Sequence, residues 1–183
     1  MLTPFAWPEM FSTAECSEII RMAEAQVLRQ AGLVRDRQNE SIRMARIAWL
    51  NEDGEAAWVL ARMMGTVLEA NRQHFRFNLS EFAEQVQIAL YDADDAGHFD
   101  WHIDIGQGAF AAKRKLTLVA QLSDPSGYQG GQLELNATGQ ITIVGHTQGD
   151  AILFPSFIPH RVTAMTAGKR YSLTTWIHGP EFQ

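Results

Sequence analysis

Cysteine and long apolar runs are both scarce in this sequence. Its one cysteine, Cys16, has no second thiol with which to form an internal disulfide. No stretch of about 18 apolar residues occurs that could cross a membrane. The first residues, Met1–Met10, lack the basic region followed by an apolar stretch that marks a signal peptide. We therefore expect a cytoplasmic protein without a membrane partner.

Basic residues are outnumbered by acidic ones. The chain has 15 Lys and Arg against 21 Asp and Glu, a formal net charge of −6, which disfavours a nucleic acid as partner. The composition is otherwise ordinary for a globular protein, with 46% apolar and 20% charged residues. The length is typical of one domain, so we expect a single domain over residues 1–183.

The first part of the chain predicts two helices. Ser12 and Glu15 have the spacing of a capping box ahead of a run of apolar residues, and Gly32 is the expected end of that helix. A second helix is expected over Glu55–His74. Apolar residues recur there at helical spacing through Trp58, Ala61, Met64, Leu68 and Phe75, and Met63 is also expected in the core.

An Arg-rich segment, Arg35–Arg46, lies between the two predicted helices. It contains no Gly or Pro and few apolar residues. We interpret it as a solvated loop, because runs of charge usually face water, and a lid or substrate-binding loop is the alternative.

From Glu84 onward the pattern alternates. Val86, Ile88 and Leu90 alternate with Gln85, Gln87, Ala89 and Tyr91, which predicts a strand with only the first set buried. Turn signals separate further strands, expected at Lys115–Leu122, Gln132–Leu135, Gln140–Val144, Ala151–Pro155, Arg161–Met165 and Lys169–Ile177. Helices followed by many short strands predict an α+β fold with a sandwich or jelly-roll core. Residues 1–83 would be a helical support and residues 84–178 the β-core.

His102 and Asp104 could act together on one metal ion. In an extended segment, residues two apart project from the same face. An imidazole and a carboxylate are two of the three ligands of a facial triad, which leaves coordination positions open and suits non-haem iron(II). His-x-Asp also occurs by chance, and a third ligand must come from another part of the chain.

His160 begins a second extended segment of interest. We expect this segment to turn at Ala167-Gly168 and to return as a hairpin, in which His160 shares a face with Arg170 and Ser172. The guanidinium of Arg170 and the hydroxyl of Ser172 could together bind a carboxylate. A buried arginine without an anion would be unfavourable, so the pattern predicts an anion site beside a metal ligand.

Several blocks of residues resemble the prolyl-hydroxylase-like branch of the 2-oxoglutarate/Fe(II) oxygenases, and within it the bacterial PKHD-type hydroxylases. They occur in the family's order over the catalytic half of the chain. The blocks are Tyr91-x5-Gly97-x-Phe99-x2-His102-x-Asp104, Arg114-Lys115-Leu116-Thr117, Leu122-Ser123-Asp124-Pro125-x2-Tyr128-x-Gly130-Gly131-x-Leu133, Gly149-Asp150-x3-Phe154-Pro155-x4-His160-x-Val162 and Gly168-x-Arg170-Tyr171-Ser172.

The resemblance implies a double-stranded β-helix, a jelly-roll variant, with iron(II) bound by His102, Asp104 and His160. It implies that Arg170 pairs with the distal carboxylate of 2-oxoglutarate, that Ser172 assists, and that Tyr91 hydrogen-bonds this cosubstrate near the metal. Dioxygen is the other cosubstrate, and ascorbate is a candidate accessory cofactor. The candidate walls of a water-poor pocket are Phe99, Trp101 and Trp176.

The implied activity is hydroxylation of an aliphatic carbon in an amino acid, a peptide or protein side chain, or another small molecule. Succinate and carbon dioxide would be the coproducts. Retention of Asp104 speaks against a halogenase, in which a small residue replaces this carboxylate. Gln121 occupies a position where some relatives carry tyrosine, so the resemblance leaves open whether a second contact to the cosubstrate carboxylate comes from there.

Other functions remain open on the sequence alone. A jelly-roll module could hold a metal or an anion without turnover. His98 and His102 have the spacing of a helical zinc pair of a hydrolase, although Phe99 follows where that motif needs Glu. The acidic residues Asp92, Asp94, Asp95 and Asp100 are interpreted as a solvated loop, with selection of a cationic substrate as the alternative.

Overall fold

The computed structural model describes residues 3–25, 29–30, 41–51 and 53–182. Its two main helices are α1 (Thr13–Glu24) and α2 (Ala57–Ala70), and a π-helical turn, Asn71–Phe75, extends α2. Short 3-10 helices lie at Gly54–Ala56, Ala93–Asp95, Ala111–Lys113 and Pro125–Gly127. Among the described residues, no helix is long and apolar enough to span a bilayer.

Strands make up most of the remaining regular structure. In chain order they are β1 (Phe5–Trp7), β2 (Arg29–Gln30), β3 (Arg43–Met44), β4 (Arg46–Leu50), β5 (Val86–Asp92), β6 (His98–His102), β7 (Arg114–Gln121), β8 (Tyr128–Gly130), β9 (Leu133–Leu135), β10 (Thr142–Val144), β11 (Ala151–Pro155), β12 (His160–Val162) and β13 (Met165–His178). The bounds of β11 agree with the sequence prediction, and those of β7, β9 and β10 lie close to it.

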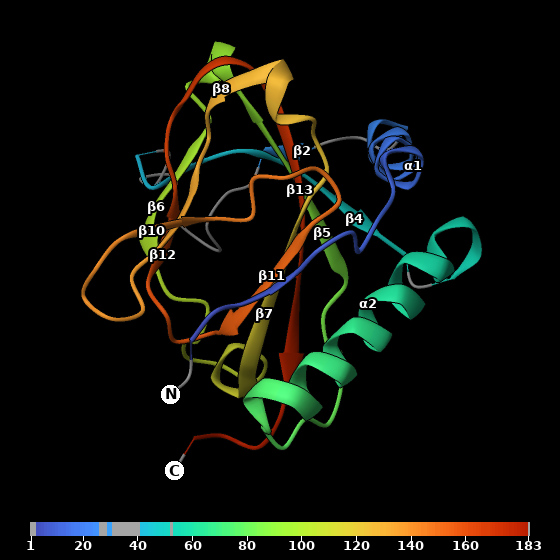
Figure 1. Cartoon of the computed structure of the whole chain (residues 1–183), viewed down its shortest axis with the longest axis vertical. Coiled ribbons are helices and arrows are strands. Elements are labelled where there is room, and N and C mark those ends of the chain that lie inside the picture. Colours follow the sequence, from blue (N-terminus) through green and yellow to red (C-terminus); the bar gives the residue numbers. More distant parts are fainter. Residues whose placement is uncertain (1–2, 26–28, 31–40, 52, 183) are drawn as a thin grey trace.

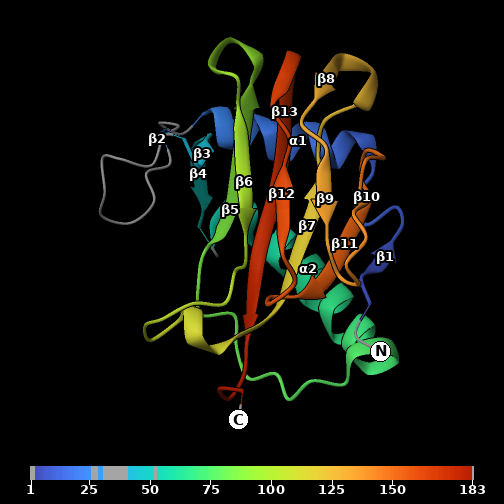
Figure 2. The ribbon, with the colours of Figure 1, turned by 90° about the vertical axis from the view of Figure 1, so that its left-hand side faces the viewer.

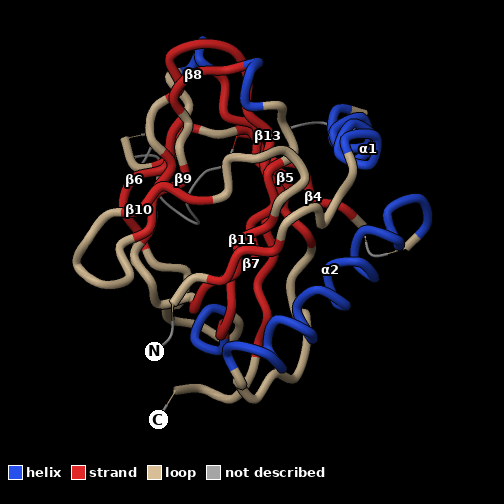
Figure 3. Tube along the Cα trace, viewed as in Figure 1, coloured by secondary structure: helices blue, strands red, loops and turns tan. Residues whose placement is uncertain are grey.

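The described strands form two facing sheets. The main sheet has eight strands in the order β1-β11-β7-β13-β5-β4-β2, with β8 attached to β13. The second sheet has five strands in the order β10-β9-β12-β6-β3. Figure 1 shows α1 and α2 on one side of the main sheet and the second sheet on the other. The turned view in Figure 2 and the trace in Figure 3 show the same three layers.

Both faces of the main sheet are buried. In β5, Ile88 and Leu90 pack with the helices in one apolar cluster, whereas Ala89 and Tyr91 belong to a second cluster between the sheets. All of Val86–Asp92 is buried. The prediction of one buried face was therefore wrong. The alternation separates the side that faces the helices from the inside of the sandwich.

α1 begins as the sequence predicts and ends earlier. The Ser12 side chain accepts a hydrogen bond from the Glu15 backbone, and the Glu15 side chain accepts one from the Ser12 backbone, which completes the capping box. The helix ends at Glu24, with Ala25 as its C-cap. Gly32, the expected end, lies outside the described residues.

α2 presents a different face to the core than predicted. Val59, Met63 and Val67 are buried, whereas Met64 and Leu68 are 41% and 62% exposed. Trp58 is partly buried against the core cluster. α2 carries apolar residues on more than one of its faces, so their spacing alone does not show which face is buried.

The part expected to be a helical support also supplies strands. β1 pairs with β11 and β4 with β5 in the main sheet, whereas β3 pairs with β6 in the second sheet. The interpretation of Arg35–Arg46 as one solvated loop was thus wrong at its end, which forms β3 and the start of β4. The segment 31–40 lies outside the described residues.

The predicted hairpin between His160 and Arg170 does not form. β12 pairs with β6 and β9 in the second sheet, whereas β13 pairs with β5 and β7 in the main sheet. Ala167-Gly168 is part of β13, where it pairs with β8. The chain therefore crosses from one sheet to the other between β12 and β13.

Asp92 is not part of a solvated loop, contrary to the sequence interpretation. It is 4% exposed at the end of β5, and its Oδ2 lies 2.6 Å from Arg46 Nη2 and 3.4 Å from Lys169 Nζ. The other three aspartates of the cluster, Asp94, Asp95 and Asp100, are exposed as expected.

Gly149 gives a test of the packing between β11 and the segment before α1. Its φ is +86°, and a Cβ atom there would lie 2.0 Å from the Phe11 carbonyl oxygen. Gly139 has a φ of +85° with nothing within 4 Å of its Cβ position. We expect Gly139→Ala to lower the free energy of unfolding by about 1–2 kcal/mol, the penalty of left-handed backbone, and Gly149→Ala to lower it by clearly more. Urea denaturation checks this, and equal losses would contradict it.

Candidate metal and cosubstrate site

β6 and β12 bring two histidines together. Antiparallel pairing sets His102, the last residue of β6, opposite His160, the first residue of β12. Side chains of directly paired residues lie on the same face. Asp104 lies just beyond β6, and its backbone N–H donates to the Ser156 carbonyl at 2.9 Å. Ligand atoms of the three side chains all lie within 4.8 Å of one another, the only such group among the described residues.

Backbone hydrogen bonds fix both imidazole rings. Nδ1 of His102 lies 2.8 Å from the Asp100 carbonyl oxygen, and Nδ1 of His160 lies 2.9 Å from the Ile158 carbonyl oxygen. A carbonyl only accepts, so Nδ1 of each ring carries a proton, and Nε2 is the nitrogen that faces Asp104. The Nε2 atoms lie 3.7 Å and 3.4 Å from the two carboxylate oxygens of Asp104.

The pKa values of the cluster favour the protonation states of metal ligands. Burial lowers the pKa of His102, and the neighbouring His160 ring acts in the same direction. Burial alone would raise the pKa of Asp104, but His160, His102 and the Thr117 hydroxyl outweigh it, so this pKa is lowered. The Thr117 hydroxyl on β7 donates to Asp104 Oδ2 at 2.6 Å. The site thus presents a neutral imidazole next to a carboxylate.

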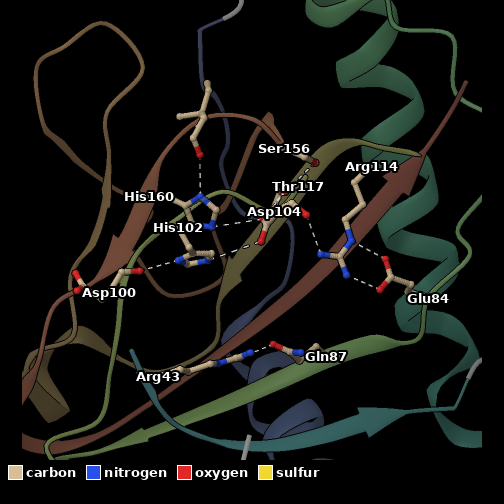
Figure 4. A network of polar contacts seen from close by, with 11 residues as sticks. Arg43, Glu84, Gln87, Asp100, His102, Asp104, Arg114, Thr117, Ser156 and His160 are labelled. Carbon is tan, nitrogen blue, oxygen red and sulfur yellow. Dashed lines mark hydrogen bonds and ion pairs between the residues drawn. The ribbon is translucent and has the colours of Figure 1, made fainter. Parts of the chain in front are cut away.

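Arg114 hydrogen-bonds to the backbone of Asp104 (Figure 4). Its Nη1 donates to the Asp104 carbonyl oxygen at 3.0 Å, and its Nε donates to Glu84 Oε2 at 2.7 Å. Glu84 also contacts the buried His178 ring, whose Nε2 lies 3.0 Å from Oε2. The Arg114 guanidinium stacks on Trp176, with Cζ 4.0 Å from the ring centroid. This network fixes the loop that carries Asp104.

A pocket lies beside the cluster, between the two sheets. The main sheet contributes Gln87, Tyr91, Val119, Arg170, Ser172, Thr174 and Trp176. The second sheet contributes Arg43, Phe99, Leu133 and Val162, together with the two histidines. The Phe99 ring stacks on His102 with the centroids 3.5 Å apart and the planes inclined by 13°. The pocket therefore combines an apolar wall with two arginines.

Arg170 is a buried cation without an anion in the described structure. Its side chain is 2% exposed, its Nε donates to Gln121 Oε1 at 2.9 Å, and its Nη1 has no hydrogen-bond partner. Gln121 is itself fixed, because its Nε2 donates to the Tyr128 hydroxyl at 2.9 Å and to the Ser123 carbonyl. Gln121 thus orients Arg170, and Tyr128 supports Gln121.

The structure collects most of the predicted site residues in this pocket. Tyr91, Arg170 and Ser172 line it with the His-Asp-His cluster, as do Phe99 and Trp176. His160 and Arg170 reach it from opposite sheets. Trp101 is absent from the lining and lies under Arg161, whose Cζ is 4.9 Å from its ring centroid.

The helical zinc pair is excluded. β6 is a strand, so the spacing of His98 and His102 is not helical. The His98 ring nitrogens lie 2.9 Å and 3.2 Å from the carbonyl oxygens of Ala96 and Ser41. His98 is thus a surface residue bound to backbone.

Sequence reasoning missed four residues around the site. Thr117 and Arg114 were identified only as part of a family block, and Arg43 only as part of a charged segment. Gln87 was placed on a solvent-facing side of β5 but is 5% exposed inside the sandwich. A polar residue within a continuous buried strand was the signal available for Gln87.

Comparisons with known proteins agree with this geometry. Residues 86–178 match the family model described as the 2OG-Fe(II) oxygenase superfamily. A PKHD-type hydroxylase of Psychrobacter sp. is 28% identical over 66% of this chain and 51% of its own length. A PKHD-type hydroxylase of Stutzerimonas stutzeri is 31% identical over 70% of this chain and 58% of its own. The chain thus spans little more than half the length of these curated relatives.

Solved structures share the fold. A prolyl-4-hydroxylase of Pseudomonas putida superposes with a TM-score of 0.76 at 24% identity, covering 98% of this chain and 94% of that one. A Trichoplax adhaerens prolyl hydroxylase, in complex with a hypoxia-inducible-factor peptide fragment, gives 0.78 at 19% identity, with coverages of 96% and 83%. The expected jelly-roll architecture is confirmed.

Glu84 links this network to stability at low pH. Burial alone would raise its pKa, but hydrogen bonds from His178 and Arg114 lower it to about 2 from 4.5. Because this pKa is lower in the folded protein, ionised Glu84 stabilises the fold at pH values above the pKa of the unfolded chain, about 4.5. This stabilisation is lost as the pH falls from about 4.5 toward 2. We expect Glu84→Gln to be less stable than wild type at neutral pH and to lose less stability across this range.

Urea denaturation at a series of pH values measures the effect. Glu181→Gln, at an exposed position, is the matched control and should retain the wild-type pH dependence. An unchanged slope in Glu84→Gln would show that the network does not act through the carboxylate.

Proposed function

Because the chain belongs to the 2OG-Fe(II) oxygenase superfamily, we propose that it is an iron(II)- and 2-oxoglutarate-dependent hydroxylase acting on an aliphatic carbon. The observation that carries the proposal is one pocket that brings together a candidate metal-binding cluster and a buried arginine. A cluster of two histidines and a carboxylate lies beside a buried arginine that has no anion among the described residues.

The cluster fits a ferrous ion. Two imidazole nitrogens and one carboxylate form the donor set of the facial triad, which leaves positions free for a cosubstrate and dioxygen. The ring orientations are set by the carbonyls of Asp100 and Ile158, and Thr117 holds the Asp104 carboxylate. Such supporting hydrogen bonds fix ligand geometry before the metal binds. We assign His102, Asp104 and His160 as the metal ligands.

Arg170 fits the distal carboxylate of 2-oxoglutarate. Its unpartnered Nη1 and its neighbour Ser172 belong to the same pocket as the metal cluster. A buried guanidinium gains most from a carboxylate that it can bind through two donors. The Tyr91 ring lies beside this guanidinium, 5.6 Å from its Cζ, so its hydroxyl is assigned to the same cosubstrate.

Iron(II) with 2-oxoglutarate and dioxygen supplies the oxidising power, yielding succinate and carbon dioxide while one oxygen atom enters the substrate. The chain positions these groups and shields them from water. Phe99 covers His102, and Trp176 is held in place by the Arg114 guanidinium. Asp104 occupies the third ligand position, which favours hydroxylation over halogenation.

Several substrate classes remain compatible with this pocket. Amino acids, peptide or protein side chains and other small molecules are all included in the proposal. A peptide is supported by the Trichoplax neighbour, whose structure contains a peptide fragment.

The proposal is tested by succinate formation. We expect succinate from 2-oxoglutarate only when iron(II) and dioxygen are both present, and its loss in His102→Ala, Asp104→Ala and His160→Ala. Arg170→Ala should raise the KM for 2-oxoglutarate, because the guanidinium that would bind its distal carboxylate is lost. Mass spectrometry of succinate is the measurement, and Arg72→Gln, on an exposed side chain, is the control.

Two results would contradict the proposal. Turnover retained in two of the three ligand variants would show that the metal is held elsewhere. Binding of 2-oxoglutarate without any succinate under air would indicate a jelly-roll module that holds an anion and does no chemistry.

Thr117 provides a separate test of the metal ligand assignment. We expect Thr117→Val to weaken divalent metal binding roughly 10- to 100-fold, because the hydrogen bond that orients Asp104 is lost. Thr175→Val is a matched control, since the Thr175 hydroxyl is buried without a partner and its removal leaves no orphaned acceptor. Calorimetric titration with Mn²⁺ measures both. Equal affinity in the two variants would exclude a role for Thr117 in ligand orientation.

A further inference from the structure

Two arginines stand apart from the others whose side chains the structure describes. Arg21, Arg46, Arg62, Arg72, Arg114 and Arg161 each pair with a carboxylate, and Arg76 is exposed. Arg43 and Arg170 have no carboxylate partner among the described residues, although neither side chain is fully exposed. Both line the pocket that contains the metal cluster. Arg170 is accounted for by the cosubstrate, whereas Arg43 is not.

Arg43 is held in place over the metal cluster. β3 pairs with β6 so that Arg43 lies opposite Phe99, and its Cζ lies 4.5 Å from the Phe99 ring centroid. The Phe99 ring in turn stacks on His102. Arg43 Nη2 donates to Gln87 Oε1 at 2.6 Å, as Figure 4 shows. The guanidinium is therefore fixed from both sheets.

Its hydrogen-bonding capacity is only partly used. Among the described residues, the side chain that hydrogen-bonds to Arg43 is Gln87, a neutral amide that accepts without neutralising the charge. The Arg43 Nε atom is buried and has no partner. A guanidinium has five N–H donors, and the one on Nε is available to a ligand in the pocket. Leaving such donors unsatisfied in a buried site is unfavourable.

The balance of charge in the pocket, with iron(II) and 2-oxoglutarate bound, also indicates a role for Arg43. A ferrous ion and Arg170 together carry as much positive charge as Asp104 and the two carboxylates of 2-oxoglutarate carry negative charge. Among the described residues that line the pocket, Arg43 is then the one uncompensated charge. A substrate with an anionic group would neutralise it, whereas a cationic substrate would be repelled.

We propose that Arg43 binds a carboxylate of the substrate, so that the preferred substrates are acids whose carboxylate lies near the hydroxylated carbon. The inference rests on the proposed oxygenase function and names a substrate class for the same site. The carboxylate is either the terminal group of an amino acid or peptide, or an acidic side chain. This assignment replaces the cationic substrate considered from the aspartates near β6, none of which lines the pocket.

The test uses the protein loaded anaerobically with iron(II) and 2-oxoglutarate. The visible charge-transfer band of this chelate reports cofactor binding, and its perturbation reports a ligand beside the metal. One set of probes consists of N-acetyl amino acids as free acids and as matched carboxamides. A second set consists of acetylated peptide amides that contain Glu or Asp, each matched with Gln or Asn. The two sets separate a terminal carboxylate from a side-chain carboxylate.

We expect acids to bind roughly 10- to 100-fold more tightly than their amides, the range for a charge-assisted hydrogen bond. Arg43→Gln should abolish this preference, and Arg43→Lys should retain part of it, because a charge without the planar fork remains. Gln87→Glu should also abolish it, since a carboxylate would then occupy Arg43 from within the protein. Arg72→Gln is the control and should bind the probes like wild type.

The outcomes separate the two proposals. If the band does not form in the wild type, the oxygenase function itself fails. If the band forms but no acid binds more tightly than its amide, the role of Arg43 is overturned. A preference that survives in both Arg43→Gln and Gln87→Glu also overturns it. Equal weakening of acids and amides in Arg43→Gln would assign Arg43 to positioning of Phe99 and His102, and would likewise overturn it.

Discussion

The pairing register between β6 and β12 determines whether the two histidines of the His-Asp-His cluster can meet. His102 and His160 are direct partners across these strands, so their side chains leave the same face of the second sheet. A slip of one residue would turn one ring to the other face. Asp104 is fixed separately, because the backbone N–H groups of Asp104 and Ile105 both donate to the Ser156 carbonyl, which follows β11 in the main sheet. The register and these hydrogen bonds together fix the cluster relative to both sheets.

A buried polar site inside a sandwich requires a partner for each charge, and most are provided. Glu84 pairs with Arg114 and His178, and Asp92 pairs with Arg46 and Lys169. Asp104 accepts a hydrogen bond from Thr117. Removing one member of such a set leaves the other uncompensated in a low dielectric. Against this background, the unpartnered donors of Arg43 and Arg170 indicate ligand groups. The rest of the network keeps these two guanidinium groups in position.

The sequence identified residues that the fold brings together in one pocket, but it did not predict which strands pair. His102, Asp104, His160 and Arg170 could be identified because their types and order resemble a family motif. The hairpin that was meant to join His160 to Arg170 was wrong, since neighbouring strands in the chain were assumed to pair. Here β12 and β13 belong to different sheets, and the residues meet because the sheets face each other. Sequence periodicity carries no information about which sheet a strand joins.

The same limit explains the other errors in the sequence predictions. The alternation in β5 correctly separated two faces, but both are buried, because helices cover one and the second sheet covers the other. Gln87 was missed for this reason, whereas Arg43 was missed because the charged segment that contains it was expected to be a solvated loop. Gly32 could not be compared, because it lies outside the described residues. The capping box of α1 was predictable, since its hydrogen bonds join residues three apart.

The placement of the charged groups has a consequence for ligand binding. The metal cluster belongs mainly to the second sheet, whereas Arg170 belongs to the main sheet, where Gln121 orients it. Under the proposed function, 2-oxoglutarate contacts both, because its oxo-acid end binds the metal and its distal carboxylate binds Arg170. The cosubstrate then joins the two sheets across the pocket. Its binding would stabilise the folded sandwich by mass action, and a substrate carboxylate on Arg43 would add a second link, since Arg43 is bonded to Gln87 of the main sheet.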